Sequence, residues 1–208
     1  DVSDSAYSGL YGELHNLDGP DLGLVTKIQD WTGQDRPTRE FLNIWRTKID
    51  ELIDGYEPDL IWFDFGLKFL QEEYKKQFLA DYYNKEQEWG RELAVTYKGH
   101  DFATGCALID YERGRMDELT YYDWITDTSV DDQGAWSYVT DAKFKSVTNL
   151  VHNLVDNVSK NGYMLLNIGP KADGSIPDGA KICLKGIGEW LAINGEAIFE
   201  TVPWVSCG

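Results

Sequence analysis

Residues 60–63 read Leu-Ile-Trp-Phe, a run of four apolar residues with no polar residue between them. A short continuous apolar run is typical of a strand that is buried on both faces, as strands of parallel sheets are. A helical apolar pattern precedes this run and another one follows it. The segment therefore predicts an α–β–α unit within a parallel α/β fold.

The rest of the chain repeats this alternation. Strands are predicted at residues 8–15, 93–97, 106–109, 124–129, 163–168 and 197–199, and amphipathic helices at 38–55, 68–88, 144–158 and around 187–191. Strands and helices that alternate in this way form right-handed βαβ units and a parallel sheet. The helix at 38–55 is expected to end at Gly55 and to bury one apolar stripe. The stripe comprises Phe41, Ile44, Trp45, Ile49, Leu52 and Ile53.

Two architectures fit such a pattern, a doubly wound sheet and a TIM-like (β/α)8 barrel. Neither a GxGxxG nor a Walker motif is present to support a nucleotide-binding sheet. Asp64, Glu112 and Asn167 follow or end predicted strands, and barrel active sites draw residues from several strand ends. A complete barrel takes about 250 residues, whereas this chain has 208. We therefore expect one partial catalytic domain over residues 1–208, with only the later part of the barrel present.

The charge of the chain excludes some classes of partner. There are 36 acidic residues against 19 basic ones, which gives a net charge of −17. Such a chain is repelled by phosphate backbones and by anionic lipid surfaces. No apolar run approaches the length that spans a bilayer. A nucleic-acid or membrane partner is therefore not expected, whereas a neutral ligand such as a sugar is compatible.

The three cysteines, Cys106, Cys183 and Cys207, are far apart and form no CxxC pair. Free thiols are expected, and neither a metal site nor a cofactor is predicted. The compartment stays open among secreted, periplasmic and lysosomal.

Asp64 comes directly after the apolar run at 60–63. In parallel α/β folds the chemistry gathers at the carboxyl ends of the strands, so Asp64 is a candidate catalytic residue. An aspartate between a strand and a helix can instead be an N-cap that accepts backbone N–H bonds. Both interpretations remain open from the local sequence.

A second carboxylate is expected after the strand at 106–109. Retaining glycoside hydrolysis requires at least two carboxyl groups, one as the nucleophile and one as the acid/base, and two different strand ends can supply them. Glu112 is favoured for the second role, and Asp110 and Glu118 are the alternatives in the same segment. Glu112 could instead be a solvated loop residue that pairs with one of the nearby arginines, Arg113 or Arg115.

Aromatic residues crowd the same segments, and such rings stack on the C–H faces of sugars, although rings of this kind also fill cores. Tyr11, Trp62, Trp124 and Trp136 are candidates for such stacking. His15 could bond a sugar hydroxyl or play a structural role.

Three segments resemble the α-L-fucosidases of glycoside hydrolase family 29. YEPDLIWFD at 56–64 resembles the family's nucleophile strand, and WITDTSVDDQGAWSY at 124–138 follows its W–TS–W–Y pattern. NGYMLLNIGPKADGSIPDGAKICLKGIGEWLAINGEAIFET at 161–201 is similar to the family's LLNIGP-ADG-IP segment and its continuation.

The resemblance implies a retaining exo-glycosidase that removes terminal α-L-fucose from glycans through a covalent fucosyl–enzyme intermediate. It implies that Asp64 is the nucleophile, that Glu112 is the acid/base, and that Trp62 lines the fucose pocket. Lys98 stands where many relatives carry an arginine that contacts fucose, and lysine lacks the planar fork of arginine. The implied partner is a fucosylated oligosaccharide or glycoconjugate.

The chain also departs from the family. The early strands with their histidine segments and the C-terminal β-sandwich have no counterpart in these 208 residues. An incomplete barrel exposes sheet edges, so we expect an oligomer or association with the missing barrel segments, and little activity from the 208 residues alone. Two alternatives stay open: a non-catalytic carbohydrate-binding fragment, and a glycosidase of the same fold that acts on a related sugar.

Overall fold

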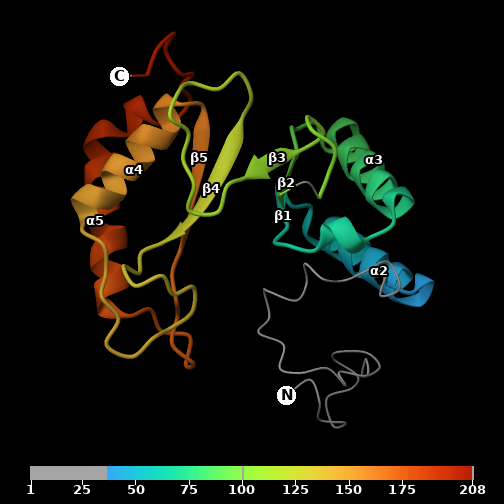
Figure 1. Ribbon diagram of the computed structural model, residues 1–208, viewed down its shortest axis with the longest axis horizontal. Helices are drawn as coiled ribbons and strands as arrows, with labels where there is room; N and C mark the ends of the chain where they lie inside the picture. The colour runs from blue at the N-terminus through green and yellow to red at the C-terminus, as the bar shows by residue number, and fades with distance from the viewer. Residues whose placement is uncertain (1–36, 100, 208) are drawn as a thin grey trace. The chain divides into compact units, whose positions relative to one another are not determined.

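The computed structural model describes residues 37–99 and 101–207 (Figure 1). Its centre is one sheet of five parallel strands, and the order of the strands in the sheet is their order in the sequence. The strands are β1 (Leu60–Trp62), β2 (Ala94–Lys98), β3 (Leu108–Asp110), β4 (Trp124–Ser129) and β5 (Gly162–Asn167). The apolar run at 60–63 therefore forms a strand over Leu60–Trp62, but the predicted burial on both faces is wrong, because Leu60 is 43% exposed and Ile61 and Trp62 are only partly buried.

Four α-helices accompany the sheet: α2 (Arg39–Tyr56), α3 (Glu72–Trp89), α4 (Val147–Ser159) and α5 (Asp178–Asn194). Two short 3-10 helices, η3 (Leu67–Phe69) and η4 (Gly195–Ala197), complete the described elements. Helix α3 joins β1 to β2 and α4 joins β4 to β5, whereas in the described residues the β2–β3 and β3–β4 connections contain no helix. The (β/α) alternation is thus complete only at the two ends of this sheet.

The helices bury two apolar clusters. Phe78 and Tyr82 of α3 pack with residues of α2 and with the β2 residues Val95 and Tyr97. In Figure 1, α4 and α5 lie side by side next to β5, and Leu150 of α4 belongs to their cluster. Because successive side chains of a strand alternate between faces, the residues between those that pack on helices point to the other face of the sheet.

Helix α2 differs from the prediction in two ways. Ile49 and Ile53 of the predicted stripe are buried, but Phe41, Ile44 and Leu52 are 44%, 48% and 55% exposed. The buried face is centred on Leu42, Ile49 and Ile53, so the helix is rotated relative to the predicted stripe.

The predicted end of α2 at Gly55 is also wrong, because the helix runs through Gly55 to Tyr56. Glu57 then takes a left-handed φ of 44°, and its N–H donates to the Ile53 carbonyl at 3.0 Å. A non-glycine residue thus supplies the turn that was assigned to Gly55.

The predicted strand at 197–199 is wrong as well. Gly195 begins η4, and the N–H groups of Ile198 and Phe199 both donate to the Gly195 carbonyl, at 2.9 and 2.8 Å. The N–H groups that a strand would donate to a neighbouring strand are therefore already bound within this turn. The predicted strand at 8–15 lies outside the described residues.

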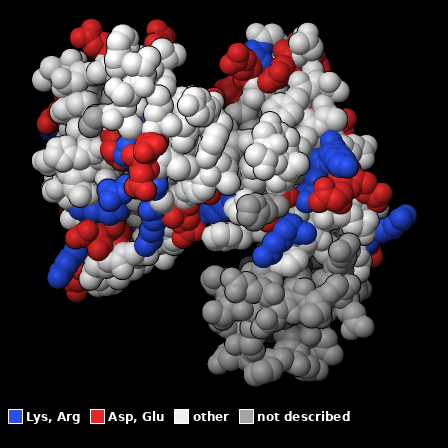
Figure 2. Space-filling model, turned by 45° about the horizontal axis from the view of Figure 1, so that its top comes forward, with Lys and Arg blue, Asp and Glu red and all other residues white. Residues whose placement is uncertain are grey.

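All three cysteines are free thiols, and Cys183 is buried. None of the described helices has the length and apolar character needed to cross a bilayer. On the face shown in Figure 2, Lys and Arg side chains lie next to Asp and Glu side chains and form no broad basic patch among the described residues. Ion pairs between helices also occur, such as Arg46–Asp81 at 2.6 Å.

Candidate active site

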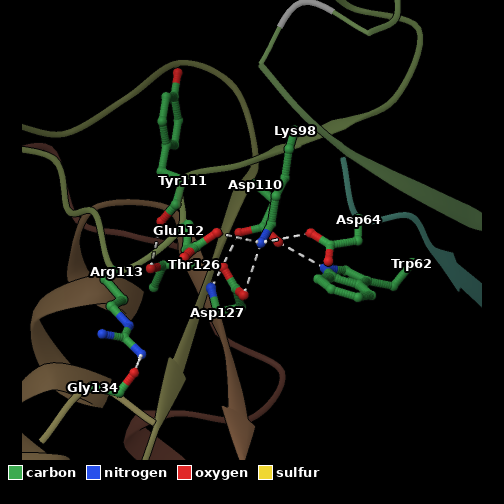
Figure 3. Close-up of polar contacts among 10 residues, drawn as sticks. All are labelled: Trp62, Asp64, Lys98, Asp110, Tyr111, Glu112, Arg113, Thr126, Asp127 and Gly134. Atoms are coloured by element: carbon green, nitrogen blue, oxygen red, sulfur yellow. Dashed lines mark hydrogen bonds and ion pairs between the residues drawn. The ribbon is translucent and has the colours of Figure 1, made fainter. Parts of the chain in front are cut away.

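Lys98 is the centre of a charged cluster at the carboxyl ends of the strands (Figure 3). Its Nζ lies 3.2 Å from Asp64, 2.9 Å from Glu112 and 3.0 Å from Asp127. Lys98 ends β2, Asp64 and Glu112 follow β1 and β3, and Asp127 lies within β4. Four neighbouring parallel strands therefore bring these four side chains together, although they are far apart in the sequence.

Asp64 reaches the cluster because the chain leaves β1 through Phe63. The ring of Phe63 packs on Phe78, with ring centroids 5.3 Å apart, and its N–H donates to the Thr96 carbonyl at 3.3 Å. Alternation then turns Asp64 to the opposite side, toward Lys98. Its side chain remains 58% exposed, so it is open to a ligand.

The structure does not give Asp64 the alternative role of N-cap. Gly66 occupies the N-cap position of η3 with a φ of 114°, a left-handed value that glycine adopts without strain. The N–H of Gly66 donates to Asp101 Oδ2 at 3.1 Å. Asp101 thus accepts the backbone N–H at the start of this turn, while the side chain of Asp64 faces Lys98.

Glu112 is placed by backbone pairing that continues past the end of β3. The N–H of Tyr111 donates to the Ile125 carbonyl, and the N–H of Arg113 donates to the Asp127 carbonyl, both at 2.9 Å. The residue between them, Glu112, directs its carboxylate to Lys98. The alternative pairing of Glu112 with Arg113 is not observed, because Arg113 donates to the Gly134 carbonyl instead.

Behind this cluster lies a buried pair of carboxyl groups, Asp110 and Asp127, which are 3% and 5% exposed. Asp110 accepts a hydrogen bond from Trp62 Nε1 at 2.7 Å and another from the backbone N–H of Asp127 at 3.1 Å. Asp127 Oδ1 is buried and has no hydrogen-bond partner among the described residues. Asp110 is therefore held inside the structure, where it fixes the indole of Trp62.

Opposing effects act on the ionisation of this site. Burial by itself lowers the pKa of Lys98, but hydrogen bonds to Glu112, Asp127 and Asp64 outweigh burial and raise its pKa above the ordinary value. Burial raises the pKa of Asp110 to about 6; the indole N–H of Trp62 opposes this shift and the charge of Asp127 adds to it. Lys98 thus stays cationic in the neutral pH range, whereas Asp110 titrates near it.

The titration of Asp110 leads to a stability prediction. Its pKa is about 6 in the folded protein and about 3.9 in an unfolded chain. The folded state therefore binds the proton more tightly, and the stability that this gives is present below about pH 4 and lost as the pH rises through about 6. The test is urea unfolding of the full-length protein. As the pH rises from 4 to 7, the free energy of unfolding of wild type should fall by on the order of 2 kcal/mol relative to that of Asp110→Asn.

The matched control for this experiment is Asp117→Asn, in an exposed part of the loop between β3 and β4. The same measurement on this variant gives the effect of removing an exposed carboxylate. A difference between wild type and Asp110→Asn that does not change with pH would contradict the prediction.

The other predicted residues are placed as follows. Trp62 lies in the cluster, with Lys98 Nζ 5.1 Å from its ring centroid. Trp136 lies at its edge, 6.0 Å from the same nitrogen. Trp124 is not brought to the cluster: it is fully buried, and its Nε1 donates to the Lys160 carbonyl at 3.0 Å.

The ring of Trp124 occupies the space in which a side chain at position 162 would stand, since a Cβ on Gly162 would come within 2.4 Å of it. Glu118 is exposed, and no contact places it in the cluster. Tyr11 and His15 lie outside the described residues.

Sequence reasoning missed Asp127. The signal that could have found it is alternation: Ile125, Asp127 and Ser129 share one face of β4, and a carboxylate inside a buried strand requires a cation. Because Lys98 occupies the space between the carboxylates, the positive charge they require is supplied by the protein itself. The described residues contain no group of three His, Cys, Asp or Glu side chains that could hold a metal ion.

A hollow of about 1010 Å³ lies at the opposite, amino-terminal end of the strands. Apolar side chains make up most of its lining, including Leu60, Leu93, Ala94, Leu108 and Tyr163. Three acidic residues, Asp59, Glu92 and Asp123, also line it, and Asp59 is paired with Arg91 at 2.6 Å. The arrangement of ionisable groups therefore favours the cluster around Lys98 as the candidate active site.

Comparison with known proteins finds one consistent group. Residues 10–196 match the family model for α-L-fucosidase. Tissue α-L-fucosidase of cattle (Bos taurus) is 33% identical over 171 residues, which cover 76% of this chain and 35% of that protein. Plasma α-L-fucosidase of Pongo abelii is 34% identical over 168 residues, with 76% of this chain and 35% of that protein covered. The chain thus spans about a third of the length of these relatives.

Solved structures agree with the sequence comparison. The α-fucosidase of Thermotoga maritima in complex with fucose is 34% identical, with a TM-score of 0.67, and the match covers 82% of this chain and 37% of that one. An α-L-fucosidase isoenzyme of Paenibacillus thiaminolyticus, with 23% identity and a TM-score of 0.66 over 83% and 44% of the chains, supports the fold alone. These matches confirm the predicted α/β fold, in which the chain forms part of a TIM-like barrel.

Proposed function

Because this chain belongs to the α-L-fucosidase family, glycoside hydrolase family 29, we propose that it forms the catalytic part of a retaining exo-glycosidase that hydrolyses terminal α-L-fucose. The observation that carries the proposal is the pair Asp64 and Glu112, held by one ammonium group at the carboxyl ends of β1 and β3. In this proposal residues 1–208 belong to one partial catalytic domain.

The spacing of the two carboxylates supports retention of configuration. Each has an oxygen within 3.2 Å of Lys98 Nζ, so these two oxygens are at most about 6 Å apart. Retaining enzymes hold their carboxyl groups about 5–5.5 Å apart, whereas inverting enzymes separate them by about 6.5–9.5 Å to admit a water molecule.

In the first step Asp64 attacks the anomeric carbon, while Glu112 donates its proton to the glycosidic oxygen and the aglycone leaves. In the second step Glu112 accepts a proton from water, the water oxygen attacks the anomeric carbon, and the bond to Asp64 breaks. Lys98 Nζ lies 3.2 Å from the Asp64 carboxylate and helps to hold it in position. Trp62, fixed by Asp110, offers an aromatic wall to the apolar face of the sugar.

The substrate in this proposal is a fucosylated oligosaccharide or glycoconjugate. The Thermotoga maritima structure, which is similar over most of this chain, was solved with fucose bound. The name of one relative refers to plasma, and a secreted location is proposed on that ground.

The proposal is tested with the full-length protein and 4-nitrophenyl α-L-fucoside, with proton NMR to identify the first anomer released. We expect turnover, α-L-fucose as the first product, and a loss of about 10²–10⁴-fold in kcat/KM for an unactivated fucoside in Glu112→Gln. β-L-Fucose as the first product would contradict the double displacement. Turnover of a related glycoside but not the fucoside would assign another sugar, and fucose binding without turnover would indicate a non-catalytic carbohydrate-binding protein.

A further inference from the structure

Arg113, the residue after Glu112, has a backbone conformation that arginine rarely adopts. Its φ is 53°, in the left-handed region. For a residue with a Cβ such a conformation is strained and persists only where the surroundings fix it. The turn is also tight, because the Gly114 N–H donates to the Tyr111 carbonyl at 2.7 Å and a Cβ on Gly114 would come within 2.8 Å of the Tyr111 Cβ.

The contacts of Arg113 explain what fixes this turn (Figure 3). Its backbone N–H donates to the Asp127 carbonyl at 2.9 Å. Its Nη2 donates to the Gly134 carbonyl at 2.6 Å, and its guanidinium carbon lies 4.3 Å from the centroid of the Trp136 ring. One residue thus ties the segment that carries Glu112 both to β4 and to the loop after β4.

That loop is itself firmly held. Asp131 Oδ1 accepts hydrogen bonds from the backbone N–H groups of Gln133 and Ala135, both at 2.8 Å. Asn167, the last residue of β5, donates to the Trp136 carbonyl at 2.8 Å. The guanidinium of Arg113 therefore lies against a ring whose backbone is bound to the end of β5, in a loop that Asp131 holds together.

We propose that Arg113 is a positioning residue that holds Glu112 in place for proton transfer to the leaving oxygen, braced by Trp136. This inference rests on the proposed function. A general acid must lie within hydrogen-bond reach of the oxygen it protonates, and a displacement of about 1 Å can cost about 10²-fold in rate. Glu112 lies on an exposed turn outside the regular strand, so its carboxylate depends on the conformation of that turn.

The effect of losing this support depends on the leaving group. An alkoxide must be protonated as it departs, whereas an acidic phenol departs without help from the acid. The value of kcat/KM reports the steps up to the first irreversible one, here the departure of the aglycone. Displacing Glu112 therefore lowers kcat/KM for an alkyl fucoside and leaves it nearly unchanged for an activated aryl fucoside.

The experiment uses the full-length protein with methyl α-L-fucoside and 2-chloro-4-nitrophenyl α-L-fucoside. In Arg113→Ala, kcat/KM for the methyl fucoside should fall about 10–100-fold and that for the aryl fucoside less than about 3-fold. Glu112→Gln should show the same contrast with a larger loss. Arg115→Ala, which removes another exposed arginine from the same loop, should leave both values unchanged.

Two further variants separate support of Glu112 from general stability. Arg113→Lys keeps the charge but lacks the planar guanidinium that stacks on a ring. In this variant kcat/KM for the methyl fucoside should fall less than in Arg113→Ala, and kcat/KM for the aryl fucoside should stay nearly unchanged. The losses in Arg113→Ala and Trp136→Phe should not add in the double variant, because the smaller ring of phenylalanine weakens the same contact that Arg113→Ala removes. Trp136→Phe alone should reproduce the contrast.

Equal losses for both substrates in Arg113→Ala would overturn the inference while the proposed function stands. Additive losses with Trp136→Phe would overturn the role of Trp136 as the brace. A wild-type protein that hydrolyses neither fucoside would contradict the proposed function, and this inference with it.

Discussion

Replacing Asp64 with glycine in the full-length protein should reduce turnover of an aryl α-L-fucoside by at least about 10³-fold. Added azide should restore much of this activity. Glycine removes the nucleophile and leaves a gap at an exposed position, and azide can enter it. The nearby ammonium of Lys98, 3.2 Å from the native carboxylate, attracts the anion. Since azide attacks from the side of the missing nucleophile, the expected product is β-L-fucosyl azide, which NMR identifies.

Asp59→Gly is the matched control, because Asp59 lies just before β1 whereas Asp64 follows it. Its activity should remain within about 2-fold of wild type, since surface substitutions away from a site have small effects. Full activity in Asp64→Gly would show that another group is the nucleophile. An inactive, folded variant that azide does not rescue would mean that Asp64 acts in some way other than direct attack.

Replacing Lys98 with methionine should have the largest effect on stability. Methionine fills similar space but leaves the carboxylate of Asp127, only 5% exposed, without its cation. Breaking a buried ion pair by removing one partner typically costs about 3–5 kcal/mol. Urea unfolding of the full-length protein at pH 7 should show a loss of this order, together with the loss of fucosidase activity.

Two comparisons make the Lys98 result specific. Lys85→Met removes a lysine that pairs with Asp54 and Glu88 at the surface, and its effect should be much smaller. Lys98→Arg keeps a cation that can bond several carboxylates, so most of the stability should return. A Lys98→Met protein no less stable than Lys85→Met would show that the cluster contributes little to folding.

The sequence was sufficient to predict that the ends of β1 and β3 bring Asp64 and Glu112 close together, whereas the catalytic roles of the two residues stay predictions. The prediction worked because parallel strands in sequence order place their carboxyl ends at one edge, whatever the details of packing. It needed only the apolar runs and the polar residues that follow them.

Features that depend on the rotation of a helix or the register of a strand could not be predicted from the apolar runs alone. Trp124 and Asp127 belong to one strand, and only the pairing of β4 with its neighbours decides that Asp127 faces Lys98 while Trp124 faces Gly162. The apolar residues of α2 fit more than one buried face, and packing against α3 selects the face with Leu42. Residues 197–199 have strand-like composition, but in the local turn that Gly195 starts, the Gly195 carbonyl accepts the N–H groups of Ile198 and Phe199.

The position of Lys98 between Asp64 and Glu112 has a consequence for the electrostatics of the proposed reaction. When Asp64 becomes an ester, its negative charge disappears, and Glu112, having given up its proton, gains one. The total charge around the ammonium is therefore the same before and after the first step, and the second step reverses the exchange. The negative charge moves from a site 3.2 Å from Nζ to one 2.9 Å from it. Because Lys98 is almost equidistant from both carboxylates, its Coulomb attraction to the negative charge changes little when that charge moves from Asp64 to Glu112. This attraction therefore favours neither of the two steps over the other.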